Sequence, residues 1–132
     1  MIVVDSSVWI DFFNGRNVPQ VRCLRMLLGS EAIIVGDLML CGVLQGLESE
    51  SEAREIEALL RLFEIVPMGG EAVAVLAAQN FRLLRRRGIT ISKTIDLLIG
   101  TWCIKNNIPL LHNDRDFRPM ARHLGLAEVR VS

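Results

Sequence analysis

Apolar and polar positions along the chain follow two alternating patterns. Short runs of apolar, often β-branched residues are typical of buried strands, whereas longer segments with apolar residues at i, i+3, i+4 and i+7 are typical of helices with one buried face. The short runs predict strands at residues 2–4, 33–35, 65–67, 109–111 and 128–131. The longer segments predict helices at residues 6–13, 19–28, 37–47, 51–63, 70–87, 94–106 and 117–124.

Short apolar strands that alternate with helices indicate a parallel sheet covered on both faces, and therefore an α/β fold. The length indicates a single domain that spans residues 1–132. We expect Ser6 or Ser7 to cap the first helix and Asp37 to cap the third. Because binding sites in such sheets form where the strands end, the polar residues that follow the strands are the candidates for chemistry.

Composition narrows the possible functions only a little. Lys and Arg total 15, as do Asp and Glu, so the formal net charge is zero and any RNA-binding surface has to be a local patch. The cysteines Cys23, Cys41 and Cys103 form no zinc-binding pattern, and we interpret them as reduced. Neither a signal peptide nor an apolar run near the roughly 20 residues of a membrane span is present. We therefore expect a cytoplasmic protein without membrane contact.

Four aspartates lie near the ends of predicted strands. Asp5 directly follows the first strand, Asp114 and Asp116 follow the fourth, and Asp96 lies in the first turn of the helix before the fourth. In a parallel sheet the ends of the first and fourth strands meet at one edge. Each aspartate alone has an ordinary interpretation as a helix cap, a turn residue, an ion-pair partner or a complement to a helix dipole.

Taken together, the acids indicate a metal site. Three converging carboxylates repel one another unless a cation lies between them, and oxygen ligands without His or Cys favour Mg²⁺ or Mn²⁺. Such an ion activates water and stabilises charge on a phosphodiester. Gly100, one turn after Asp96, either leaves room for a metal or phosphate or admits a close helix contact. Ser6 and Ser7 have no His–Asp partner nearby, which argues against a serine hydrolase.

The opening MIVVDSSVWIDFF and the later segment KTIDLLIGTWCIKNNIPLLHNDRDF resemble the first and second halves of VapC-type PIN domains, the ribonuclease toxins of toxin–antitoxin pairs. The similarity spans nearly the whole chain. It implies a three-layer α/β/α sandwich around a mostly parallel sheet, and Mg²⁺- or Mn²⁺-dependent endoribonuclease activity on structured RNA of the transfer or ribosomal class. It also implies a VapB-type antitoxin as partner and a homodimer.

The same resemblance assigns roles to individual residues. Asp5, Asp96 and Asp114 would be the metal-binding and catalytic acids, with Asp116 and Ser6 close to them. One position departs from the family pattern.

This position is Gly42, which stands where the family has a Glu in the helix after the second strand. Glycine inside a helix costs ~0.5–1 kcal/mol relative to alanine, so helix propensity does not explain it. Either the Glu has been replaced, by accident or by design, which silences a toxic enzyme, or the chain is a naturally degenerate member; we favour the first. We therefore predict a weakened or inactive endoribonuclease, and the alternative is a non-catalytic PIN-fold module that pairs with an antitoxin.

Two groups of basic residues are candidates for RNA contacts. Arg115 and Arg118 begin a series at helical spacing beside Asp114, and we expect them to bind RNA phosphates. Residues 82–93, which contain four Arg and Lys93, have an equally good interpretation as the cationic C-terminus of a helix and its flank.

Overall fold

The computed structural model describes all residues from Met1 to Ser132. Its strands are β1 (Ile2–Val4), β2 (Ile33–Gly36), β3 (Glu64–Val66) and β4 (Leu110–Leu111). Its helices are α1 (Ser6–Phe13), α2 (Pro19–Leu27), α3 (Asp37–Leu44), α4 (Glu50–Leu60), α5 (Glu71–Arg86), α6 (Thr94–Asn106) and α7 (Arg118–Leu124), with a 3₁₀ turn, η1 (Arg115–Phe117), directly before α7.

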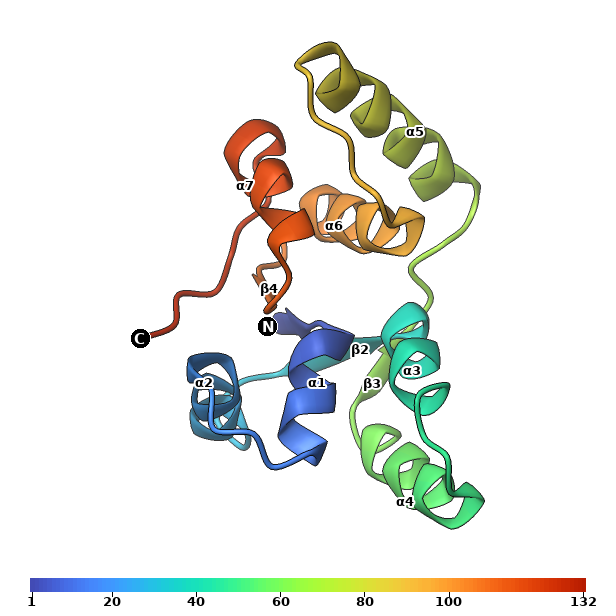
Figure 1. Cartoon of the computed structure of the whole chain (residues 1–132), viewed down its shortest axis with the longest axis vertical. Helices are drawn as coiled ribbons and strands as arrows, with labels where there is room; N and C mark the ends of the chain where they lie inside the picture. The colour runs from blue at the N-terminus through green and yellow to red at the C-terminus, as the bar shows by residue number, and fades with distance from the viewer.

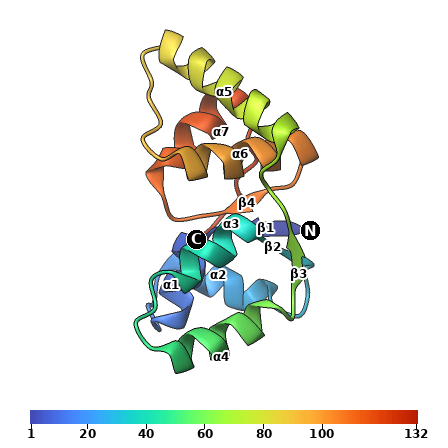
Figure 2. The same ribbon diagram turned by 90° about the vertical axis from the view of Figure 1, so that its right-hand side faces the viewer.

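The strands form one parallel sheet in the order β3-β2-β1-β4. Helices α1 to α4 lie on one side of this sheet and α5, α6 and α7 on the other, so the sheet is the middle of three layers (Figure 1 and Figure 2). After β3 the chain crosses back and places β4 beside β1, on the side away from β2. The connections that leave β1 and β4 therefore run to opposite faces, which is the arrangement that opens a ligand crevice in α/β sheets.

The core explains why the strands are apolar without alternation. Both faces of the sheet are covered, and Val3 of β1 and Leu110 of β4 are fully buried. On the α1 side, the buried Trp9 has its ring centroid 5.8 Å from that of Phe13 and 5.5 Å from that of Phe63. This aromatic cluster packs α1 against the end of α4 and fixes the start of α1, where the first candidate acid lies.

The architecture confirms the predicted α/β/α sandwich with a parallel sheet, but the predicted last strand is wrong. Glu128 makes a single parallel bridge to Leu110, and residues 128–131 form no strand. The reason is that β4 has only two residues, which leaves a fifth strand little to pair with.

Two capping predictions are also wrong. Asp5 rather than a serine caps α1. Asp37 is the first residue of α3, not its cap, and its Oδ1 accepts a hydrogen bond of 2.9 Å from the backbone N–H of Met68. Helix α3 ends at Leu44, three residues before the predicted end at residue 47. Its C-cap is Gln45, and Gly46 comes next.

No helix of the chain combines the length and the apolar character needed to cross a membrane.

Candidate functional site

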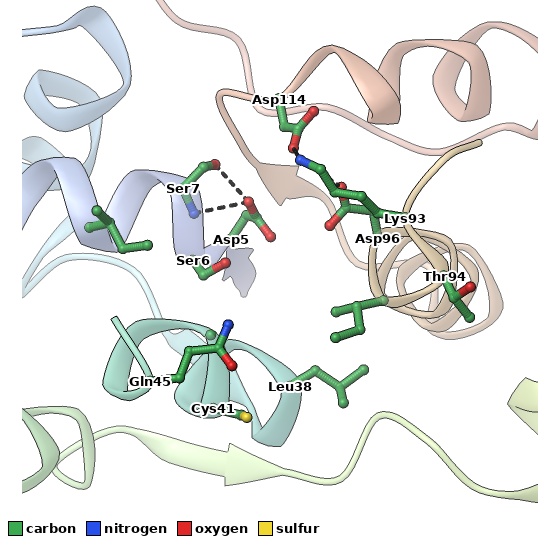
Figure 3. A pocket seen from close by; sticks show the side chains of 13 residues that line it. Asp5, Ser6, Ser7, Leu38, Cys41, Gln45, Lys93, Thr94, Asp96 and Asp114 are labelled. Atoms are coloured by element: carbon green, nitrogen blue, oxygen red, sulfur yellow. Dashed lines mark hydrogen bonds and ion pairs between the residues drawn. The ribbon is translucent and has the colours of Figure 1, made fainter. Parts of the chain in front are cut away.

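A cavity of about 490 Å³ lies at the ends of β1 and β4, between the first turns of α1 and α6 and one face of α3 (Figure 3). Four separate stretches of the chain contribute its walls. The lining residues are Asp5, Ser6, Ser7, Ile10, Leu38, Cys41, Gly42, Gln45, Lys93, Thr94, Ile95, Asp96 and Asp114. The structure thus brings the three predicted acids and the altered position 42 together in one crevice.

Asp5 is fixed by the residue two positions later. Its Oδ2 accepts hydrogen bonds from the Ser7 backbone N–H at 3.0 Å and from the Ser7 hydroxyl at 2.6 Å. The Ser7 Oγ also accepts from the backbone N–H of Asn113 at 3.2 Å, which joins the start of α1 to the loop after β4. Asp5 Oδ1 is buried and has no hydrogen-bond partner. Burial raises the pKa of Asp5, although the hydrogen bonds from Ser7 act in the opposite direction.

Asp96 reaches the same crevice from the first turn of α6. The residue is 8% exposed, and its Oδ2 has no hydrogen-bond partner. Burial, together with repulsion from Asp5 and then Asp114, raises the pKa of Asp96 from 3.8 to about 7. Because two of these causes are neighbouring carboxylates, the crevice gathers more negative charge than it can readily hold.

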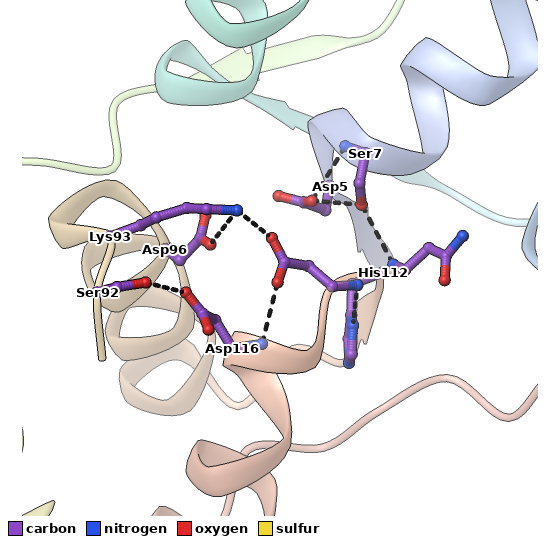
Figure 4. A network of polar contacts seen from close by, with 9 residues as sticks. Asp5, Ser7, Ser92, Lys93, Asp96, His112 and Asp116 are labelled. Carbon is purple, nitrogen blue, oxygen red and sulfur yellow. Dashed lines mark hydrogen bonds and ion pairs between the residues drawn. The ribbon is translucent and has the colours of Figure 1, made fainter. Parts of the chain in front are cut away.

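Asp114 lies in the loop after β4 and caps η1. Its Oδ1 accepts from the backbone N–H of Asp116 at 3.0 Å, and its own backbone N–H donates to Nδ1 of His112 at 3.2 Å (Figure 4). His112 Nε2 in turn lies 2.6 Å from a carboxylate oxygen of Glu128. Glu128, whose backbone makes the single β-bridge to Leu110, therefore also helps through His112 to hold the loop that carries Asp114.

Lys93 places a positive charge among these acids. Its Nζ lies 2.7 Å from Oδ2 of Asp114 and 3.8 Å from Oδ2 of Asp96. Partial burial works to raise the pKa of Asp114, but the hydrogen bonds from Lys93 and from the Asp116 N–H outweigh it, and the pKa is lower than usual. The hydrogen bond to Asp114 also raises the pKa of Lys93, so both groups are held in their charged forms.

The two glycines near the site have different roles. A Cβ on Gly100 would lie 2.3 Å from Sδ of Met120, so this glycine admits a close contact between α6 and α7 and does not serve to leave space for a metal or phosphate. Gly42 lines the crevice, and a Cβ there would lie 3.2 Å from Cβ and Oγ of Ser6. Gln45, the C-cap residue of α3, also lines the crevice.

The donor set fits a hard divalent cation. Two buried carboxylate oxygens, Asp5 Oδ1 and Asp96 Oδ2, have no hydrogen-bond partner, and such groups are costly unless something binds them. Asp96, Asp114 and Asp116 each offer a carboxylate oxygen within 4.8 Å of the others. All these donors are oxygens, as Mg²⁺ and Mn²⁺ prefer.

Comparison with known proteins decides the family. The family model of the PIN domain matches residues 2–123. The chain belongs to the PIN domain family. Ribonuclease VapC11 of Mycobacterium tuberculosis (strain ATCC 25618 / H37Rv) is 27% identical over 124 residues, which are 92% of each chain. Ribonuclease VapC1 of Methanocaldococcus jannaschii is 28% identical over 125 residues, 95% of this chain and 84% of that one.

A solved structure shares the fold. The structure of VapBC2 from Rickettsia felis bound to a DNA fragment from its promoter superposes with a TM-score of 0.77 at 18% identity and covers 98% of both chains. At this level of identity the likeness concerns the architecture of the PIN domain.

Some predicted site residues of this PIN domain lie beside the crevice and do not line it. Asp116 accepts a hydrogen bond of 3.1 Å from Ser92 and contacts Asp114 through its backbone. Arg115 and Arg118 are exposed on η1 and at the start of α7, next to the Asp114 loop. Ser6 lines the crevice, but the hydrogen bonds to Asp5 come from its neighbour Ser7.

Sequence reasoning missed the contributions of two residues. Ser7 holds Asp5 and bridges to the Asp114 loop, and the repeated serine in Asp-Ser-Ser was a signal for it. Lys93 appeared in the sequence only as part of a basic stretch, whereas it lies inside the acidic site. Its position three residues before Asp96, on the same face of the first turn, was the available signal.

Proposed function

We propose that residues 1–132 form a single PIN domain that acts in the cytoplasm as a VapC-type toxin, a divalent-metal-dependent endoribonuclease for structured RNA such as transfer or ribosomal RNA. The single observation that carries this proposal is the crevice in which Asp5, Asp96 and Asp114 converge, with two buried carboxylate oxygens that accept no hydrogen bond. The names of the VapC ribonucleases that match over most of the chain support the same activity.

Asp5, Asp96 and Asp114 would hold the Mg²⁺ or Mn²⁺ ion. When bound, such an ion supplies an activated water and stabilises the charge that develops on the scissile phosphodiester. Ser7 keeps Asp5 oriented through Oδ2, so that Oδ1 stays available to the crevice. His112 and Asp116 fix the backbone and Oδ1 of Asp114.

Arg115 and Arg118 would bind RNA phosphates that flank the site. Both are exposed beside the Asp114 loop, and arginine contacts to phosphates position a nucleic acid without reading its sequence. Because the net charge of the chain is zero, such a local group of cations is the feature that would attract RNA.

Gly42 favours a second candidate function, a PIN-fold module that binds an antitoxin without cutting RNA. The family Glu would project from α3 into the crevice, and this chain offers there only the neutral amide of Gln45. With one carboxylate fewer, the site binds a cation more weakly. We therefore expect the chain as it stands to cut RNA slowly or not at all.

RNA cleavage by this chain and by its Gly42→Glu variant tests both functions. Each protein is incubated with transfer and ribosomal RNA in Mn²⁺, in Mg²⁺ and in chelator. Gly69→Glu is the matched control, because a Cβ on Gly69 meets nothing within 4 Å and Gly69 does not line the crevice. We expect Gly42→Glu to cut at least about tenfold faster than the chain as it stands or the control, and chelator to stop it.

The outcomes separate the candidates. Equal, chelator-sensitive cleavage by all three proteins means that three aspartates suffice and that position 42 is not part of the site. No cleavage by any of them favours the binding module. Replacement of Asp96 by Asn in the active variant has to abolish cleavage, and cleavage that survives it contradicts the assignment of the site.

The proposed partner is a VapB-type antitoxin, which the VapBC structure with the same fold supports. An apolar pocket of about 170 Å³ between α1 and α4 offers a surface for an amphipathic partner helix. Its rim includes Leu59 and Leu62, which are 50% and 80% exposed. The homodimer expected from the family resemblance stays a prediction, which light scattering of the purified chain would check.

A further inference from the structure

Lys93 occupies an unusual position for a lysine. It is the N-cap residue of α6 and makes no side-chain capping hydrogen bond. The N-terminus of a helix carries partial positive charge, so a cation there is unfavourable. Its side chain nevertheless turns into the acidic crevice, where it reaches Asp114 (Figure 3) and Asp96 (Figure 4).

The ammonium group lies where a bound metal ion would have to be coordinated. Nζ is 2.7 Å from Asp114 Oδ2 and 3.8 Å from Asp96 Oδ2, so it stands between the two carboxylates. A divalent ion that binds both carboxylates needs oxygens at roughly 2.0–2.6 Å. The ion and the ammonium would compete for the same oxygens and repel each other.

The side chain is able to leave. Lys93 is 60% exposed, and its stem is long and flexible, so its ion pairs hold it only weakly. Asp5, which has its own hydrogen bonds from Ser7, does not depend on Lys93 for its position. Departure of the ammonium therefore leaves Asp5 in place, and Asp114 keeps its hydrogen bond from the backbone N–H of Asp116.

We propose that Lys93 is a tethered counter-cation that offsets part of the negative charge of Asp114 and Asp96. A divalent ion that binds these two carboxylates has to displace it. Lys93 sets the metal affinity by competing with the ion for the oxygens of these two carboxylates. This inference rests on the proposed metal-dependent function. In this inference Lys93 opposes metal binding, whereas the three acids promote it.

The test is titration calorimetry of the whole chain with Mn²⁺. The variant Lys93→Met removes the ammonium and keeps the stem. Lys105→Met is the matched control, since Lys105 lies in the last turn of the same helix, about 18 Å away along its axis, and its loss changes the net charge equally. We expect Lys93→Met to bind Mn²⁺ about three- to tenfold more tightly than Lys105→Met, and Lys93→Arg to remain close to the unaltered chain.

A second readout separates competition from a merely structural ion pair. The rise in Tm that saturating Mn²⁺ causes should be larger in Lys93→Met than in Lys105→Met. A structural ion pair would instead lower the Tm of Lys93→Met by the same amount with and without Mn²⁺, and that result overturns the proposal.

The calorimetric outcomes distinguish this inference from the proposed function. Mn²⁺ binding that requires Asp96 but is equal in Lys93→Met and Lys105→Met overturns the role of Lys93 alone. Binding by Lys93→Met when the unaltered chain binds none supports it strongly. Absence of Asp96-dependent binding in the unaltered chain and in Lys93→Met overturns both the role of Lys93 and the metal site.

Discussion

Replacing Asp96 by Asn tests whether the crevice is electrostatically strained without a metal. The substitution removes a charge and keeps the shape of the side chain. Asp96 has a side chain that is 11% exposed, and its pKa is raised from 3.8 to about 7, first by burial and then by Asp5 and Asp114. A carboxyl group whose pKa is raised by folding stabilises the fold fully below pH 3.8, and this contribution is lost as the pH rises through about 7.

The magnitude follows from this difference in pKa. At pH 8, a pKa of 3.8 in the unfolded chain and about 7 in the fold correspond to about 4 kcal/mol of lost stability if expressed in full. The pKa of about 7 already includes the opposing charge of Lys93, and water that enters the open crevice screens part of the remaining repulsion. We therefore expect Asp96→Asn to stabilise the metal-free protein at pH 8 by about 1–2 kcal/mol, which raises the Tm by roughly 3–10 °C.

The assay is thermal unfolding in chelator between pH 5 and pH 8. Glu71→Gln is the control, because Glu71 is an exposed acid in the first turn of α5. Its replacement removes a comparable interaction with a helix dipole. Asp96→Asn should be the more stable protein at pH 8, and its advantage should shrink towards pH 5. Saturating Mn²⁺ should then stabilise the unaltered chain and not the variant.

The opposite result is equally informative. If Asp96→Asn is less stable than the unaltered chain at pH 8 in chelator, or if both lose stability equally from pH 5 to pH 8, Asp96 is not a strained carboxylate. The raised pKa and the case for a cation between these acids would then both be wrong.

Two further substitutions test the supports of the site. Ser7→Ala should weaken Mn²⁺ binding about tenfold in calorimetry, because Asp5 loses the 2.6 Å bond that orients it, while Ser6→Ala should leave binding nearly unchanged. Gly100→Ala should cost about 1–3 kcal/mol in urea unfolding, because its Cβ would meet Met120 Sδ at 2.3 Å, and a second substitution, Met120→Ala, should not add its full cost to this. Additive losses would show that the two sites do not touch.

The meeting of the acids could be predicted because it depends on topology and not on detailed packing. Residues that directly follow parallel strands emerge at one edge of the sheet. Asp5 and Asp114 follow β1 and β4, which are neighbours in the sheet, so their side chains converge whatever surrounds them. Asp96 joins them because the first turn of α6 faces the same edge.

The partners of these acids could not be predicted, because they depend on the orientation of each side chain and on segments distant in the sequence. Ser6 and Ser7 are adjacent and identical in type, and only the start of α1 decides which of them binds Asp5. The role of Gly100 is decided by Met120, which arrives from another helix. The short length of β4, which removes the fifth strand, depends on where the Asp114 loop begins.

Gly42 and Lys93 both break local rules, and both line the crevice. Sequences that specify a fold satisfy local preferences except where another demand intervenes. Gly100 breaks the rule for helix interiors too, but there a Cβ would overlap the thioether end of the buried Met120, so a larger residue needs Met120 to adopt another rotamer. At Gly42 a Cβ would lie 3.2 Å from Cβ and Oγ of the half-buried Ser6, and because the Ser6 Cβ moves only with the backbone of α1, a larger residue needs α1 and α3 to separate by a few tenths of an ångström. Packing therefore mildly favours glycine at position 42, and a larger residue there would also change the chemistry of the crevice that it lines.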